Sequence, residues 1–195
     1  MNTIRIAIFA SGTGTNADAI STHFKNHPKI EVALVVTSKH DAGVIKVAEK
    51  HGVDYIVLQK QDFQDENLVM EVLEGYEINY CVLAGWLLLI PTYLVKAFEG
   101  KMLNIHPALL PKFGGKGMYG KHVHEAVKET GESESGITIH QVNEDFDKGE
   151  IIAQIKVKIL PDDSADEIER KVRTLELAHY ADEIEKLIEA QTIFL

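Results

Sequence analysis

The stretch "IRIAIFASGTGTNA" (residues 4–17) sets the class of fold. Its first part, "IRIAIFA" (4–10), is a continuous apolar run rich in β-branched residues, which predicts a strand buried on both faces. "SGTGTN" follows with the glycines that a tight turn needs, and a helix is predicted from about Thr15 to Lys25. A strand, a glycine-rich turn and a helix in this order are typical of the first unit of a parallel sheet.

The same alternation continues through the first half of the chain. Apolar runs predict further strands over 30–38, 54–59 and 78–86, and helical patterns lie between them over 41–52 and 65–76. Gly52 is a stop signal for the first of these helices. We therefore predict an α/β protein of Rossmann-like type, in which a mostly parallel twisted sheet has helices on both faces.

The pattern changes after residue 100. A strand over 100–106 is followed by a glycine-rich loop (112–121) and a helix over 122–129. Two strands, "SGITIHQV" (135–142) and "GEIIAQIKVKI" (149–159), are joined by a polar segment, which predicts an antiparallel C-terminal portion. A long amphipathic helix is expected over 164–189, with Asp162, Asp163 and Ser164 at its start as N-cap candidates. No linker-like segment interrupts the chain, so we expect a single domain over 1–195.

Composition narrows the classes of function. The formal net charge of −10 disfavours binding of nucleic acid through its phosphates. Cys81 is the single cysteine, so an internal disulfide framework is excluded, and a cytoplasmic location is expected. The sequence also holds no apolar stretch long enough to span a bilayer.

The turn after the first strand has the features of an anion site. Gly12 and Gly14 allow a ligand to approach the backbone closely, the helix N-terminus supplies N–H groups, and Thr15 and Asn16 add side-chain donors. The motif is not a Walker A loop, and it nearly fits the dinucleotide fingerprint with Ala17 in the third place. However, the second strand does not end in an acidic residue that could hold a ribose. A phosphate monoester is the favoured ligand, and a turn that only packs strand on helix is the alternative.

"MLNIHPALLPKF" (102–113) places two polar side chains on one strand face. Asn104 and His106 are two residues apart, so both point to the same side at the C-terminal end of the strand, where open α/β sheets bind ligands. An amide donor beside an imidazole can stabilise an oxyanion and move a proton, which suits acyl transfer to a nucleophile. The alternative is a strand-end asparagine that caps a loop beside a core histidine.

A carboxylate in the loop "NEDFDKGEI" (143–151) is a candidate partner of this pair. We favour Asp147, with the strand residue His140 nearby, and Asp145 and Glu144 remain rivals. A carboxylate beside His106 is expected to raise the pKa of the imidazole.

The sequence predicts no metal site and no activated serine or cysteine nucleophile. His122 and His124 are two residues apart on a predicted helix, where side chains at this spacing do not share a face. We therefore favour structural roles for these two histidines.

With these motifs in view, the sequence resembles the folate-dependent formyltransferase family, and within it the phosphoribosylglycinamide formyltransferase branch. The resemblance covers essentially the whole chain. It rests on "SGTGTN", "LAGWLLLIP" (83–91), "MLNIHPALLPKF", "SGITIH" followed by "DFDKGEII" (145–152), and "VRTLELAHY" (172–180).

The resemblance implies roles for matching positions. Asn104, His106 and Asp147 match the catalytic residues, with His140 in support. Glu176 matches the acid that holds the glycinamide end of the substrate, and Arg173 lies where the family has a polar or basic residue near the ribose phosphate. Two larger sets are implied: a phosphate loop of Gly14, Thr15 and Asn16, and a folate pocket of Leu87, Leu88, Leu89, Ile90, Asn104, Asn143, Glu144, Asp145, Phe146 and Asp147.

The implied reaction transfers the formyl group of 10-formyltetrahydrofolate to the amine of glycinamide ribonucleotide in de novo purine synthesis. It needs no metal, and members of the family are monomers or homodimers. One alternative is a formyltetrahydrofolate hydrolase, which uses water as the acceptor. A methionyl-tRNA formyltransferase fits poorly, because it needs a tRNA-binding domain and the chain is acidic. The alternative from another class is a non-catalytic nucleotide-binding module that keeps only the glycine loop.

Overall fold

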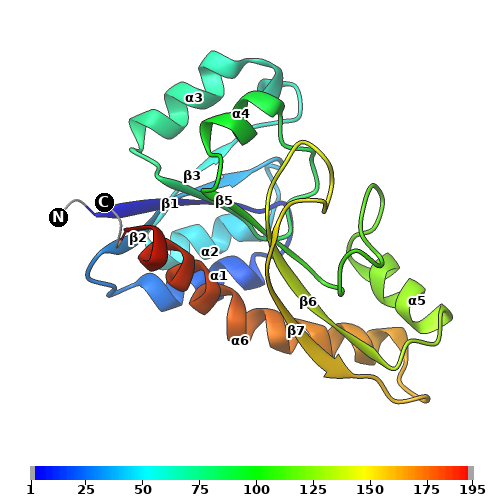
Figure 1. The fold of residues 1–195 in the computed structure, drawn as a ribbon. Helices are drawn as coiled ribbons and strands as arrows, with labels where there is room; N and C mark the ends of the chain where they lie inside the picture. Colours follow the sequence, from blue (N-terminus) through cyan, green and yellow to red (C-terminus); the bar gives the residue numbers. More distant parts are fainter. Residues whose placement is uncertain (1–2, 193–195) are drawn as a thin grey trace. The chain divides into compact units, whose positions relative to one another are not determined.

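The computed structural model describes residues 3–192, and its fold is drawn in Figure 1. Internal packing divides the chain into two compact units, Met1–Leu103 and Asn104–Leu195. The expectation of a single domain over the whole chain stays a prediction.

The first unit is built around parallel strands in the order β3-β2-β1-β4. Residues 6–9 of β1 are completely buried, because β1 pairs on both edges and helices cover both faces of the sheet (Figure 1). Helices α1 and α2 lie on one face, and α3 and α4 on the other. The elements are β1 (Ile4–Phe9), α1 (Thr15–Phe24), β2 (Ile30–Thr37), α2 (Val44–His51), β3 (Asp54–Val57), the 3-10 helix η1 (Asp62–Gln64), α3 (Glu66–Gly75), β4 (Tyr80–Leu83) and α4 (Thr92–Ala97).

Local signals account for most of these bounds. Gly52 ends α2 in a left-handed conformation, with φ +67°, as its stop signal predicts. Asp65 caps α3 by accepting a hydrogen bond from the Leu68 N–H. Strand β4 is shorter than the predicted 78–86, because Gly85 takes a φ of +75° and turns the chain away from the extended conformation. The short helix α4 was not predicted from the sequence.

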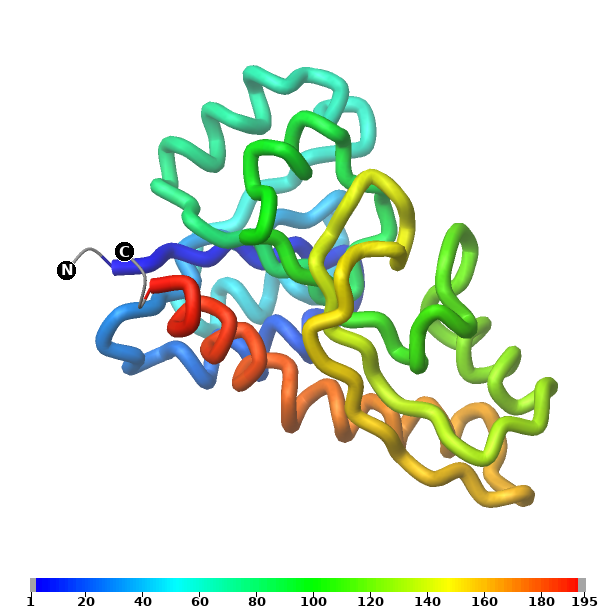
Figure 2. Tube along the Cα trace, in the orientation of Figure 1, coloured from blue at the N-terminus to red at the C-terminus, as the bar shows by residue number. Residues whose placement is uncertain are grey.

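The second unit contains most of strand β5 and all that follows it. Strands β6 and β7 pair antiparallel as expected, with Thr138 directly opposite Gln154. The loop 142–150 joins them and is easily followed in Figure 2. Helix α6 packs against α5, β6 and β7. The elements are β5 (Met102–His106), α5 (Lys121–Glu129), β6 (Glu134–Gln141), β7 (Ile151–Lys158) and α6 (Ala165–Thr192).

The start of α6 is fixed by a capping box. The Ser164 hydroxyl accepts a hydrogen bond from the Glu167 N–H, and the Glu167 carboxylate accepts one from the Ser164 N–H, at 3.2 and 2.7 Å. The Asp163 carboxylate accepts a further bond from the Leu160 N–H at 2.7 Å. The N-cap predicted at this position is therefore confirmed.

The strands follow the order β3-β2-β1-β4-β5-β6-β7 in one mixed sheet. The predicted fold class, mostly parallel with an antiparallel C-terminal portion, is confirmed. Across residues 3–192, no helix has both the length and the apolar character that crossing a membrane requires.

Candidate active site

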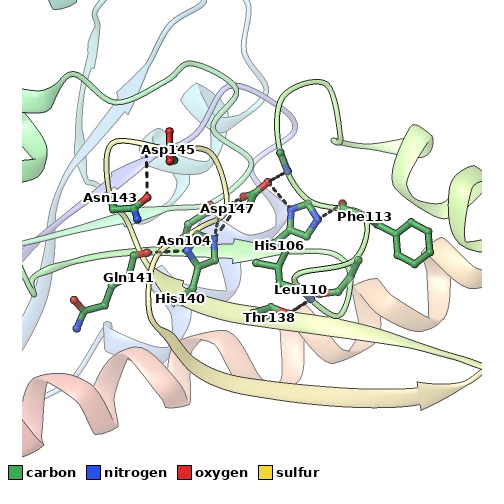
Figure 3. A network of polar contacts seen from close by, with 12 residues as sticks. Asn104, His106, Leu110, Phe113, Thr138, His140, Gln141, Asn143, Asp145 and Asp147 are labelled. Carbon is green, nitrogen blue, oxygen red and sulfur yellow. Dashed lines mark hydrogen bonds and ion pairs between the residues drawn. The ribbon is translucent and has the colours of Figure 1, made fainter.

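Asn104 and His106 lie at the C-terminal end of β5, and both side chains reach Asp147 (Figure 3). The Asn104 amide nitrogen lies 3.4 Å from one Asp147 carboxylate oxygen, Oδ1. The His106 Nδ1 lies 3.4 Å from the other, Oδ2. Because the two residues contact one carboxylate, the predicted projection from a shared strand face is confirmed.

Asp147 is the acidic residue of the loop 142–150 that reaches the Asn-x-His pair. Its Oδ2 also accepts a hydrogen bond from the Gly115 N–H at 2.9 Å. The rival Asp145 instead pairs with Lys148 at 3.2 Å and exposes 65% of its side chain. Glu144 is likewise exposed. The structure therefore selects Asp147 among the three candidate carboxylates.

His140 and Asp147 both contact the Asn104 amide nitrogen. The Nδ1 of His140 lies 2.8 Å from the Gln141 carbonyl oxygen, which can only accept, so Nδ1 carries a hydrogen. Its Nε2 lies 3.1 Å from the Asn104 amide nitrogen. The Asp147 carboxylate beside the same nitrogen can only accept, so the amide turns its NH₂ group, rather than its oxygen, toward this carboxylate.

His106 has an acceptor beside each ring nitrogen. Its Nε2 donates to the Phe113 carbonyl oxygen at 2.7 Å, and its Nδ1 faces Asp147. A neutral imidazole carries only one N–H, so a full set of two hydrogen bonds requires the protonated ring. Phe113 and Asp147 both hold left-handed backbone conformations, with φ of +59° and +57°. Strained non-glycine residues of this kind are concentrated at functional sites.

Burial decides the resting charge of His106. Burial lowers the pKa of this imidazole, and the opposing effects of Asp147 and the Phe113 carbonyl are smaller, so the net direction is downward. The contribution of Asp147 has the expected sign, but the net direction is opposite to the expected rise, because a nearby carboxylate can be recognised in a sequence but the depth of burial cannot. The ring is mainly neutral at neutral pH, with a proton-stabilising group beside each nitrogen.

Asp147 is ionised at neutral pH. Burial would raise the pKa of its carboxyl, but the contacts with His140 and His106 and the hydrogen bond from Gly115 outweigh burial and lower it. The cluster therefore combines a carboxylate, a buried neutral imidazole and an oriented amide.

The backbone of the glycine loop in the first unit lies very close to the start of helix α2. Gly14 has a φ of +84°, and a Cβ atom at this position would lie 2.7 Å from the Cα of Val44. The Gly12 carbonyl accepts a hydrogen bond from the Val44 N–H at 3.1 Å, so the loop is held against the start of α2. Gly14 is the N-cap of α1 and offers no side chain to its first N–H groups. Thr15 is exposed at this end of the helix.

The proposed folate segments differ in exposure. In the 87–90 segment, Leu87 and Leu89 expose 43% and 50% of their surface while Ile90 is buried, which leaves apolar area on the first unit. In the 143–147 segment of the second unit, the Asn143 side chain accepts a hydrogen bond from the Asp145 N–H at 3.1 Å and so shapes the loop.

The remaining predicted residues lie on helices of the second unit. Arg173 and Glu176 are both on α6, and Arg173 is paired with Glu169 of the same helix at 2.5 Å. His124 is buried, whereas His122 is exposed and lies 3.4 Å from Glu125. The expectation that these two histidines occupy different faces of α5 is confirmed.

Two partners of the cluster, the Phe113 carbonyl and the Gly115 N–H, were not predicted. They are backbone groups, so side-chain patterns carry no direct signal for them. The glycine-rich stretch "KFGGKG" (112–117) indicates only that the backbone turns there.

Comparisons with known proteins indicate one family for the chain. The family model described as formyl transferase matches residues 4–184. The chain is 41% identical to the chloroplastic phosphoribosylglycinamide formyltransferase of Arabidopsis thaliana over 174 residues, which cover 86% of this chain and 60% of that protein. It is 35% identical to the Bacillus subtilis phosphoribosylglycinamide formyltransferase, with 94% of each covered.

Solved structures of phosphoribosylglycinamide formyltransferases are also similar to this chain. The phosphoribosylglycinamide formyltransferase from Bacillus halodurans superposes with a TM-score of 0.84 at 36% identity, covering 94% of this chain and 95% of that one. The chain spans 60–62% of the length of the two plant relatives that it matches.

Proposed function

The chain belongs to the formyl transferase family, and on that premise we propose that it transfers a formyl group from 10-formyltetrahydrofolate to the amine of glycinamide ribonucleotide. The observation that carries the proposal is the convergence of Asn104, His106 and His140 on the Asp147 carboxylate. It supports acyl transfer to an amine, which requires an oxyanion donor and a group that accepts and returns a proton.

Asn104 supplies the oxyanion donor. Attack of the amine on the formyl carbon forms a carbon–nitrogen bond and leaves negative charge on the formyl oxygen. The contact between the Asn104 amide and Asp147 is long, at 3.4 Å, so a substrate oxygen at normal hydrogen-bond distance can compete for that hydrogen. The shorter contact with His140, at 3.1 Å, keeps the NH₂ group oriented while this exchange takes place.

His106 accepts the proton that the attacking amine must lose. The ring starts neutral because burial lowers its pKa, and negative charge on the formyl oxygen then favours the imidazolium. Asp147 stabilises the new charge from 3.4 Å. As the carbon–N10 bond breaks and the carbonyl re-forms, the proton passes to N10. The contacts with Asp147 and Phe113 are strongest for the charged ring, so they favour the transition state over the resting site.

The other predicted residues bind the two substrates. In the first unit, the loop of Gly14, Thr15 and Asn16 is assigned to phosphate binding through the N-terminus of α1, and the exposed leucines of the 87–90 segment to folate binding. In the second unit, Arg173 and Glu176 of α6 are assigned to the ribose phosphate and the glycinamide end, and the 143–147 segment to folate binding. We also predict that the enzyme is cytoplasmic and that it is a monomer or a homodimer.

The test is formyl transfer by the purified chain. Loss of the formyl group from a 10-formylfolate analogue is followed by absorbance, with and without glycinamide ribonucleotide. Signal that depends on the acceptor supports the proposal. Signal without the acceptor indicates a hydrolase, and absence of signal in both cases indicates a binding module that does not catalyse this reaction.

A further inference from the structure

The turn between β5 and α5 supplies two backbone groups to the candidate active site. The Phe113 carbonyl accepts from His106 at 2.7 Å, and the Gly115 N–H donates to Asp147 at 2.9 Å. A substitution at Phe113 or at Gly115 would also change the backbone conformation that the position favours. The role of these two backbone groups therefore cannot be tested by replacing the residues that carry them. What holds the turn in place therefore determines the surroundings of both titratable groups.

Thr138 of β6 binds this turn through its hydroxyl. The hydroxyl donates to the Ala108 carbonyl at 2.7 Å and accepts from the Leu110 N–H at 3.0 Å. Its second lone pair accepts from the Gln154 side-chain amide at 2.9 Å. A hydroxyl has one hydrogen and two lone pairs, so all three of its bonding positions are used. Thr138 is completely buried, which makes each of these bonds costly to lose.

Gln154 completes the contact from the neighbouring strand. It lies directly opposite Thr138 in the antiparallel pair, and its amide nitrogen also donates to the Leu110 carbonyl at 2.8 Å. Both polar backbone groups of Leu110 are thus bound by side chains, one from β6 and one from β7 (Figure 3 shows the Thr138 contact). We call Thr138 and Gln154 the turn clamp.

The position of Leu110 affects the position of the Asp147 carboxylate, because Gly114 lies between the two side chains. A Cβ atom on Gly114 would lie 2.4 Å from the Leu110 Cδ2 and 3.3 Å from the Asp147 Cβ, so Gly114 is packed tightly between these two side chains. A shift of Leu110 would be transmitted through this contact to Asp147. The same shift would move Phe113, whose left-handed backbone depends on its surroundings.

We propose that Thr138 and Gln154 are positioning residues for the reaction: by fixing Leu110, they hold the Phe113 carbonyl against His106 and the Gly115 N–H against Asp147. This proposal rests on the proposed formyl transfer only for its kinetic test, which measures that reaction. Neither residue touches the reacting atoms, and both act through the turn.

Thr138→Val removes the hydroxyl and keeps the shape of the side chain, and Thr138→Ser keeps the hydroxyl. We expect Thr138→Val to lower kcat by about tenfold or more, with KM within about threefold, because small displacements of catalytic groups are costly. Thr138→Ser should recover most of the lost rate. Gln154→Met is expected to act in the same direction as Thr138→Val. Lys156→Met, two residues along the same strand, is the matched control and should behave as the wild type.

A readout independent of activity is the NMR titration of the His106 imidazole in the folded protein without substrate. Weakening of the Phe113 hydrogen bond should lower the pKa of His106 in Thr138→Val and in Gln154→Met, because that bond raises the pKa. If Thr138→Val does not fold, Gln154→Met carries the test. A His106 titration in the folded variants that matches the wild type would overturn the proposal, and so would equal rates in the valine and serine variants.

Because the titration needs no substrate, its outcome is separate from that of formyl transfer. An inactive wild-type protein whose His106 pKa still responds to the clamp variants would refute the proposed reaction and leave the clamp standing.

Discussion

Replacing Asp147 by asparagine removes the charge that stabilises protonated His106 while keeping the size of the side chain. At the observed 3.4 Å separation, Coulomb's law with an effective dielectric constant of about 20 gives an attraction of roughly 5 kcal/mol. Solvent entry and rearrangement reduce this value. If about half is effective in the transition state, the loss of roughly 2.5 kcal/mol corresponds to about a 70-fold lower kcat.

The assay is steady-state formyl transfer as a function of pH, with Asp145→Asn as the matched control from the same loop. Asp145 is 65% exposed and pairs with Lys148, so its variant should keep the wild-type rate. In wild type the acid limb of kcat/KM should lie below pH 6.5, because burial lowers the pKa of His106 and the proton acceptor must be neutral. In Asp147→Asn this limb should move to still lower pH, since the carboxylate raises that pKa. A kcat within threefold of wild type, or an acid limb that does not move, would refute the role assigned to Asp147.

Asn104→Ala should lower kcat by about 100- to 1,000-fold, the usual cost of one oxyanion donor, with an unchanged thermal midpoint; a rate near wild type would exclude that role. Gly149→Ala should lower the melting temperature by several degrees, since its Cβ would lie 1.7 Å from the Gln141 carbonyl oxygen, whereas Gly75→Ala, with open space around it, should not. The free energy of unfolding should fall as pH drops below about 6.5, the ordinary pKa of histidine, because His106 binds protons less readily folded than unfolded. In denaturant titrations His106→Asn should show a smaller fall, and an equal one would contradict the assigned burial effect.

Much of the fold could be predicted because its signals are local. The buried run of β1 and the stop at Gly52 are both visible in the sequence, and both are confirmed. Helix α4 was missed because it has only six residues, too few for a periodic pattern. The end of β4 was placed too late because the apolar run continues past Gly85, where the backbone turns.

The candidate site was predictable where side-chain spacing determines geometry. Asn104 and His106 share a strand face because the period of a strand is two residues, and both reach Asp147. Contacts made by backbone groups, such as the Phe113 carbonyl, depend on how a turn folds back and carry no such pattern. The direction of the His106 pKa was wrong for a related reason: burial is a property of the whole packed unit.

Formyl transfer to glycinamide ribonucleotide is tested most directly by following the fate of a labelled formyl carbon. In a single turnover, the purified chain is mixed with a ¹³C-formyl donor and glycinamide ribonucleotide, and the products are examined by NMR. We predict that the label appears as a formamide on the glycinamide amine, with tetrahydrofolate as the other product. Label recovered as free formate, or left on the donor, would contradict this prediction.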